Sequence, residues 1–217
     1  MDSGDAMLTV ICVLKSGGDV YDQSWVEKLK AGVERNLTVP HEFVCLSDVE
    51  VPCKRIPLEQ DWPGWWSKIE LFRKGVITEP TLYLDLDTVI VGNINALARQ
   101  QSDFAMLPNV NVKGMVGSGI MWFNEVPHHV YEKFAKMPQC YIEHHERNAN
   151  ASTCYIGDQA FIHDALNNNV DTITTDGIKS FKHDCRNRLP IDASVVCFHG
   201  KPRPNEVHNE WMERYWK

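Results

Sequence analysis

The sequence lacks any long hydrophobic run and any leader-like segment at its start. Without a stretch of about eighteen apolar residues, it encodes no expected membrane-spanning helix. The first residues, MDSGDAM, also lack the basic and apolar regions of a secretory signal peptide. We therefore expect a protein without a transmembrane segment, located in the cytoplasm.

Positive charge is also scarce. The 22 lysines and arginines are outnumbered by 29 acidic residues, which gives a formal net charge of −7. Binding a nucleic acid requires a concentrated basic surface, and this composition does not supply one. We therefore expect no nucleic-acid partner, whereas a small phosphorylated ligand needs only a few local cations.

Paired cysteine motifs and linkers are missing too. The seven cysteines are scattered and contain no Cys-x-x-Cys pair, so we expect reduced thiols rather than disulfides or a structural zinc site. No repeat or low-complexity segment divides the chain, and its most loop-like stretch is the polar segment 143–152. With 43% hydrophobic residues, the sequence predicts one globular domain spanning residues 1–217.

The hydrophobic pattern near the start predicts a β-α-β unit. Residues 8–14 are apolar on both faces, as in a buried parallel strand, and two glycines soon follow. Residues 24–37 carry apolar side chains at helical spacing, and a second strand is expected at 42–46. The unit predicts an α/β fold with a mainly parallel central sheet flanked by helices. Its ligand crevice should lie beyond the carboxyl ends of the strands.

The rest of the chain continues the alternation of strands and helices. We predict a short helix at 66–75 and a strand at 81–85. Further strands are expected at 104–107, 119–123 and 195–198, and further helices at 130–137 and 159–166.

Two aspartates at the end of the 81–85 strand form a candidate metal site. In extended backbone, residues two apart point to the same side, so Asp85 and Asp87 should aim two carboxylates at one point. Such close like charges repel unless a cation lies between them, and Mg²⁺ or Mn²⁺ carrying a diphosphate is a natural partner. Chance alone gives roughly one Asp-x-Asp triplet in such a chain. This triplet, however, lies in an otherwise apolar run.

Five motifs occur in a fixed order along the chain. They are Trp66-Ser-Lys68-Ile-Glu-Leu-Phe72, Leu82-Tyr-Leu-Asp85-Leu-Asp87, Gly117-Ser-Gly-Ile-Met-Trp-Phe-Asn124, Gly157-Asp158-Gln159 and Cys197-Phe-His199-Gly200-Lys201-Pro202. In this order they resemble the glycogenin-like, retaining glycosyltransferases of the GT-A fold, from the first strand to Pro202. The resemblance implies a metal-dependent enzyme that transfers a hexose with retention from a nucleotide-sugar, UDP-linked, to an acceptor.

The resemblance assigns the metal and phosphate contacts. In that family an acid pair and a late histidine hold Mn²⁺, roles that fall on Asp85, Asp87 and His199, with Mg²⁺ as the alternative ion. Imidazole is a suitable ligand for Mn²⁺, although an isolated histidine is more often structural. The family's late lysine contacts the donor phosphates and corresponds to Lys201. Because the motif here is shorter and has Arg203 after the proline, both cations stay candidates.

Four more residues are implied in donor binding. Lys68 corresponds to a basic residue near the donor phosphates, although an exposed helix lysine is an equally good interpretation. Leu14 and Lys15 would border the base, and Tyr21 would stack on it. A packing role for the tyrosine is the alternative.

The resemblance also names residues around the transferred sugar. Ser118 and Asn124 flank a glycine-rich segment similar to the family's sugar-facing strand. Asp158 would face the sugar, with Gln159 beside it, whereas a helix N-cap with a nearby acid is the structural alternative. The acceptor, whether glycan, protein or small molecule, is not identified by these motifs.

Three neighbouring tryptophans open a question about the acceptor. Trp62, Trp65 and Trp66 bracket a proline and a glycine. They form either an aromatic wall for an acceptor sugar or part of the hydrophobic core.

Two other classes of protein compete with this interpretation. A haloacid-dehalogenase-like phosphatase would use Asp85 as nucleophile and Asp87 as acid and base. That superfamily places its nucleophile strand near the start of the chain, whereas two strands and two helices are expected before Asp85. A catalytically silent nucleotide-sugar-binding module is the second alternative, and the intact acid pair weighs against it. Nucleotidyltransferases usually carry a fuller basic, glycine-rich loop than residues 15–18 provide.

Overall fold

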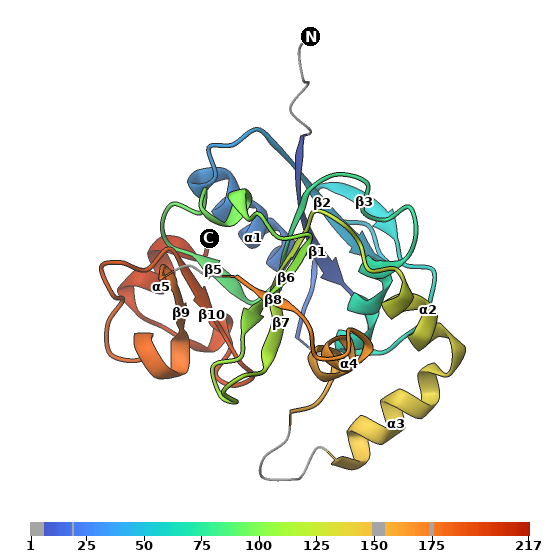
Figure 1. Ribbon diagram of the computed structural model, residues 1–217. Coiled ribbons are helices and arrows are strands. Elements are labelled where there is room, and N and C mark those ends of the chain that lie inside the picture. The colour runs from blue at the N-terminus through green and yellow to red at the C-terminus, as the bar shows by residue number, and fades with distance from the viewer. Residues whose placement is uncertain (1–6, 19, 149–154, 174–175) are drawn as a thin grey trace.

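The computed structural model describes residues 7–18, 20–148, 155–173 and 176–217 of the chain. Within them, a seven-stranded sheet with the order β3-β2-β1-β4-β7-β6-β8 forms the centre. A three-stranded sheet with the order β5-β10-β9 lies to one side, and helices α2, α3 and α4 lie on the other (Figure 1).

The central sheet is mostly parallel. Strands β1 (Leu8–Leu14), β2 (His41–Ser47), β3 (Lys54–Pro57) and β4 (Thr81–Leu84) pair in parallel. Strand β7 (Val116–Phe123) is antiparallel to both β4 and β6 (Phe104–Pro108), and the short β8 (Asp171–Thr172) pairs in parallel with β6. The expected α/β fold with a mainly parallel sheet is therefore confirmed.

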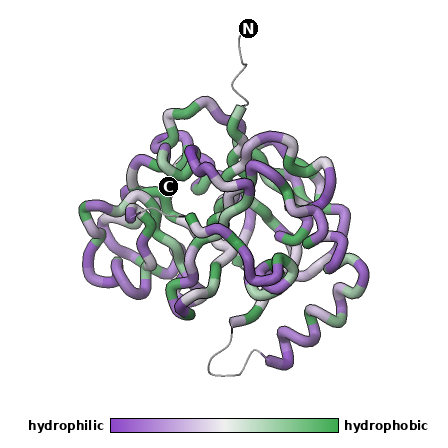
Figure 2. The backbone as a smooth tube through the Cα atoms, in the orientation of Figure 1, coloured by the Kyte–Doolittle hydropathy of each residue, from purple (hydrophilic) through white to green (hydrophobic). Residues whose placement is uncertain are grey.

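Strand β1 is apolar on both faces because each face packs into its own core. Val10 and Cys12 belong to a cluster with the buried side chains of α1 (Gln23–Asn36), whereas Ile11 packs with Trp66 on the opposite face. Helix α1 begins where the side chain of Asp22 accepts a hydrogen bond from the Ser24 amide at 2.8 Å. Figure 2 shows hydrophobic residues gathered along the central strands and hydrophilic residues over the outer loops.

The second sheet was not expected from the sequence. Strand β10 (Val195–Cys197) pairs antiparallel with β5 (Thr88–Ile90) and parallel with β9 (Ile178–Ser180). The strand predicted at 195–198 therefore forms, but it belongs to this small sheet and not to the central one. The chain turns sharply after β4, so β5 leaves the central sheet and provides an edge on which β10 pairs.

Two helical segments differ from the prediction. The expected helix at 66–75 is a 3₁₀ helix, η1 (Gly64–Phe72), which ends before the positive-φ turn at Gly75. The polar segment from 143, predicted as a loop, is instead helical to Asn148, within α3 (Pro138–Asn148), and residues 149–152 lie outside the described residues. The prediction missed α3 because Ile142 is its only buried residue, so it has almost no apolar stripe.

The remaining elements are short. They comprise η2 (Leu97–Arg99), α2 (His129–Lys136), α4 (Asp158–Ala165), the π-helical turn η3 (Phe181–Cys185), η4 (Pro204–Glu206) and α5 (Glu210–Tyr215). The C-terminal end is tied to α1, where the Arg35 guanidinium donates to the carbonyls of Tyr215 and Lys217.

None of the helices in the described ranges is both long and apolar enough to cross a bilayer. Six cysteines fall within these ranges, and all six are free thiols, as expected; Cys154 lies outside them.

Candidate active site

The two aspartates of the acidic motif lie on a tight turn, not on an extended strand. Strand β4 ends at Leu84, and the Thr88 amide donates to the Asp85 carbonyl at 3.0 Å. We expected strand alternation to align the two carboxylates. This reason is wrong, because the two residues lie on a turn. The turn brings Asp85 and Asp87 together at the junction of the two sheets, where β4 ends and β5 begins.

The second sheet brings His199 toward the same turn. In the antiparallel pairing of β10 with β5, Cys197 lies opposite Thr88, the residue after Asp87. His199 follows two residues later. Burial and the charge of Lys182 lower the pKa of His199, and the Asp85 carboxylate opposes them in part. Strand pairing in the small sheet therefore places the segment that carries His199 beside the acidic turn.

Lys68 lies at the centre of a buried polar network. Its ammonium nitrogen is 2.8 Å from Asp158 Oδ2 and 3.2 Å from Asp85 Oδ1, and it donates to Ser118 Oγ at 3.0 Å. Ser118 in turn donates to Asp158 Oδ2 at 2.6 Å. An exposed helix lysine is excluded by this burial. The network joins η1, the acidic turn, β7 and the start of α4.

The charges of this network stabilise one another. Burial alone lowers the pKa of Lys68, but the carboxylates of Asp158 and Asp85 outweigh it, so the net pKa is raised and the lysine stays protonated. Tyr83, fully buried on β4, donates its hydroxyl to Asp85 Oδ1 at 2.5 Å. Sequence reasoning missed Tyr83, although its position two residues before Asp85 on an apolar strand was a usable signal.

Glycines of β7 leave space beside the acids. A Cβ at Gly119 would lie 3.5 Å from Asp85 Oδ2, and one at Gly117 would lie 3.7 Å from Gln159 Oε1. Both glycines lie within strand β7. Asn124 does not belong to this site, because β7 runs antiparallel to β4 and ends beside Thr81, at the opposite end of the sheet.

Arg203 and Tyr21 cover the other acid. Tyr21 donates to Asp87 Oδ2 at 2.9 Å, and Arg203 donates to the Tyr21 hydroxyl while its guanidinium lies 4.9 Å from the centre of the tyrosine ring. One face of Tyr21, the residue expected to stack on a base, is thus occupied by Arg203. The guanidinium nitrogen Nε of Arg203 is buried without a hydrogen-bond partner, so this cation has an unused donor.

The acidic turn carries an unbalanced charge that fits a cation. Burial and the charge of Asp85 raise the pKa of Asp87 to about 7. His199 Nε2 is buried and has no hydrogen-bond partner, and its lowered pKa leaves the imidazole neutral, the form that binds metals. In the described part of the chain, no three His, Cys, Asp or Glu side chains are spaced to hold a metal as they stand. Shared coordination would therefore require side-chain movement.

A pocket of about 470 Å³ opens beside this cluster at the end of β1. Leu14 and Tyr21, two of the three residues expected to contact the base, line it together with Ser16 and Val49. Lys15 does not line the pocket. Its amine pairs with Asp48 at 2.6 Å and with Asp61 at 2.9 Å, so it is already neutralised by two carboxylates.

A lysine that the sequence did not suggest lies beside Gly200, the residue after His199. Lys201 is 84% exposed at its side chain and lies 3.8 Å from Glu206. Lys182, half-buried after β9, lies 3.9 Å from the position of a Cβ on Gly200, and its charge lowers the pKa of His199. Among the described residues, no carboxylate pairs with Lys182. A three-residue strand far along the chain gave no signal of this proximity.

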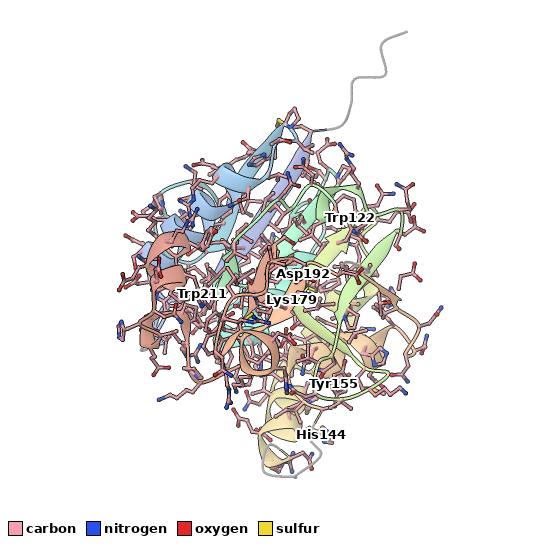
Figure 3. The ribbon with its side chains drawn as sticks, turned by 90° about the vertical axis from the view of Figure 1, so that its left-hand side faces the viewer. Trp122, His144, Tyr155, Lys179, Asp192 and Trp211 are labelled. Carbon is pink, nitrogen blue, oxygen red and sulfur yellow. The ribbon has the colours of Figure 1, made fainter. Side chains whose placement is uncertain are left out.

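Asp158 and Gln159 begin α4 beside the lysine network. Gly157, with a φ of +80°, provides the N-cap without a side-chain hydrogen bond, so Asp158 is not a capping residue but a buried partner of Lys68. Just before it, Tyr155 donates its hydroxyl to the Val116 carbonyl at 2.7 Å and so ties this segment to β7. Figure 3 labels Tyr155, together with the Lys179 and Asp192 pair of the small sheet, which are 2.6 Å apart.

The three tryptophans separate into two groups. Trp62 and Trp66 are buried and pack against Phe134, so for these two the core interpretation is correct. Trp65 is 56% exposed and lies against Gly157.

No protein-family model and no curated protein matches the sequence. Solved structures do match. The glycosyltransferase GlyE of Streptococcus pneumoniae TIGR4 is 13% identical, with a TM-score of 0.61 over 96% of this chain, which spans 60% of GlyE. An active-site mutant of LgtC is 12% identical, with a TM-score of 0.60 over 95% of this chain and 93% of its own. A galactosyltransferase LgtC complex with donor and acceptor sugar analogs has a TM-score of 0.55 at 12% identity, over 90% of this chain and 88% of its own.

At these identities the likeness is one of fold. The matches with GlyE and the LgtC mutant extend over 96% and 95% of this chain. The shared feature is the mostly parallel sheet flanked by helices. The chain therefore has the α/β fold of GT-A-type glycosyltransferases.

Proposed function

We propose that this protein is a metal-dependent glycosyltransferase that moves a hexose, with retention, from a UDP-linked donor to an acceptor hydroxyl. The supporting observation is the position of one buried network, in which Lys68 joins Asp85 to Asp158 beside the pocket at the end of β1. A GT-A-type fold places its nucleotide-sugar at this end of the sheet, so the fold and the polar network coincide.

The nucleotide would bind from the pocket toward the acidic turn. Its base would occupy the space lined by Leu14 and Tyr21, which requires the Arg203 guanidinium to leave the tyrosine ring. The released Arg203 would then be free to contact the diphosphate. Lys182, beside His199 and without a carboxylate partner in the described residues, is a better placed second cation than the exposed Lys201.

A divalent cation, Mn²⁺ or Mg²⁺, would be held by Asp85, Asp87 and His199. The raised pKa of Asp87 and the unpartnered Nε2 of His199 both support this ligand set, because a bound cation relieves the carboxylate repulsion and satisfies the imidazole nitrogen. When bound, the ion would offset the negative charge that develops on the departing diphosphate.

Asp158 and Gln159 would orient the transferred hexose. Lys68 and Ser118 fix the Asp158 carboxylate, and Gln159 lies over the side-chain-free position of Gly117. In the transfer, the bond from the anomeric carbon to the diphosphate oxygen breaks. A new bond forms from that carbon to the acceptor oxygen, whose proton leaves with the nucleoside diphosphate. Rigidly held polar groups at this place favour such a reaction by preorganisation.

The experiment that tests this function compares two substrate classes on one protein sample. UDP-glucose or UDP-galactose with Mn²⁺ should slowly release UDP even without an acceptor, whereas p-nitrophenyl phosphate should not be cleaved. Labelled phosphate trapped on Asp85 would instead establish the phosphatase alternative. UDP binding without release from any UDP-hexose would establish the silent binding module.

A further inference from the structure

Trp65 is the single aromatic residue among the large hydrophobic side chains exposed in the described ranges. Its two tryptophan neighbours are buried in the core, so burial explains them but not Trp65. Exposing half of an indole ring to water forgoes a large hydrophobic gain. An exposed ring next to a candidate active site is therefore a candidate binding surface.

The helix type places Trp65 over the lysine network. Segment η1 is a 3₁₀ helix, in which residues three apart lie on the same side. Trp65 and Lys68 are therefore on one side of η1, separated along its axis by about 6 Å at roughly 2 Å per residue. That separation is about the length of one sugar ring. The Lys68 end of this side is bound to Asp158.

The start of α4 positions the indole from the other side. A Cβ on Gly157 would lie 3.4 Å from Trp65 Nε1 and 3.7 Å from its Cε2, so the pyrrole edge of the ring faces the side of Gly157 that carries no side chain. Gly157 has a φ of +80°, which a larger residue would rarely adopt. Trp65 is thus held against the residue that precedes Asp158, while much of its ring stays open to solvent.

We propose that Trp65 is the stacking platform for a pyranose ring of the acceptor, next to the place where the hexose is transferred. The proposal rests on the glycosyltransferase function proposed above. A pyranose presents a face of weakly positive C–H groups, which the negative face of an indole attracts, while its hydroxyls stay free for polar contacts. A ring on Trp65 would extend toward Asp158, so that one of its hydroxyls reaches the transferred sugar.

The test uses simple sugars as probes on the full chain loaded with UDP and Mn²⁺. The α- and β-methyl pyranosides of glucose, galactose and mannose are tested by saturation-transfer NMR, and galactitol, with similar hydroxyls but no ring, is the chemical control. At least one pyranoside should receive saturation on the C–H protons of one face. Trp65→Ala should reduce its affinity about three- to tenfold, because the stacking contact with the indole ring is lost. Trp65→Phe should retain part of it.

Met137→Ala is the matched control, because Met137 is also exposed, at 54%, but lies between α2 and α3. It should leave pyranoside binding unchanged, and thermal melting should show that every variant is folded. Three results would each contradict the stacking role of Trp65 without contradicting the donor site. They are equal pyranoside binding by Trp65→Ala, equal saturation of galactitol, and no pyranoside binding while UDP binds. A failure of UDP itself to bind would overturn the proposed function together with the platform.

Discussion

The Lys68 ammonium nitrogen lies 2.8 Å from Asp158 Oδ2, so a buried ion pair joins η1 to the first turn of α4. The two side chains are only 9% and 8% exposed. Neither group is stable at this depth without the other, because an isolated buried charge has a large desolvation cost. The pair is thus both a structural link and the support of the proposed sugar-binding acid.

Removing the positive charge of this pair should therefore destabilise the fold. We expect Lys68→Met to lower the free energy of unfolding by about 3–5 kcal/mol, since it leaves buried carboxylates without a partner. The control is Lys74→Met, whose amine is 3.4 Å from Glu132 at a 74% exposed position and whose loss should cost less than about 1 kcal/mol. Urea denaturation measures both. Equal stability of the two variants would show that the Lys68 network contributes nothing.

His145 should make the start of α4 sensitive to pH. Its Nδ1 accepts a hydrogen bond from the Gly157 amide at 3.1 Å, and burial and the neighbouring His144 lower its pKa from 6.5. A protonated ring has no acceptor at Nδ1 and would face the amide with a second donor.

The sign of the effect follows from this lowered pKa. Above pH 6.5 the imidazole is neutral in both the folded and the unfolded state, so its full contribution to stability is present. As the pH falls below 6.5, the unfolded state takes up the proton first, and this contribution is lost. Thermal melting from pH 7.5 to 5 should show a steeper loss of stability in the wild type than in His145→Gln. The exposed His129, changed to Gln, is the control and should follow the wild type. Parallel curves for wild type and His145→Gln would contradict the role of His145.

Lys182 and Lys201 should differ as phosphate ligands. A charged hydrogen bond contributes about 1.5–3 kcal/mol, so Lys182→Met should weaken UDP binding about tenfold or more. Lys201→Met removes a side chain that is 84% exposed and should change the affinity little. Calorimetric titration of UDP into both variants compares them directly. A large loss in Lys201→Met with none in Lys182→Met would restore the role that the motif resemblance gave to Lys201.

The inner strands of the central sheet and helix α1 were predictable because local patterns encode them. Strand β1 is apolar at every position that the two cores cover, and α1 follows from its helical spacing. These features depend on residues close together in the sequence. The resemblance placed Lys68 near the donor phosphates, but its ion pairs with Asp85 and Asp158 were not predicted.

The features that could not be predicted from the sequence depend on long-range pairing. Strand β9 has three residues and forms only because β10 offers it an edge, so the approach of Lys182 to Gly200 had no local signal. The turn at Asp85 likewise follows from β5 leaving the central sheet, whereas the apolar residues on both sides of the motif favoured one continuous strand. The exposure of Trp65 between two buried tryptophans was undetermined for the same reason.

In the proposed function, Asp85 and Asp87 hold a divalent cation against a nucleotide diphosphate. The carboxylates and the diphosphate repel each other, so a shared cation must couple their binding. Calorimetric titration of UDP into the wild type, with and without Mn²⁺, measures this coupling most directly, and Asp87→Asn is the matched variant because it keeps the shape of the side chain but removes its charge. We predict that Mn²⁺ raises UDP affinity at least about tenfold in the wild type and that Asp87→Asn loses most of this gain while remaining folded. Equal UDP affinity with and without Mn²⁺ in the wild type, or full coupling in Asp87→Asn, would contradict the claim.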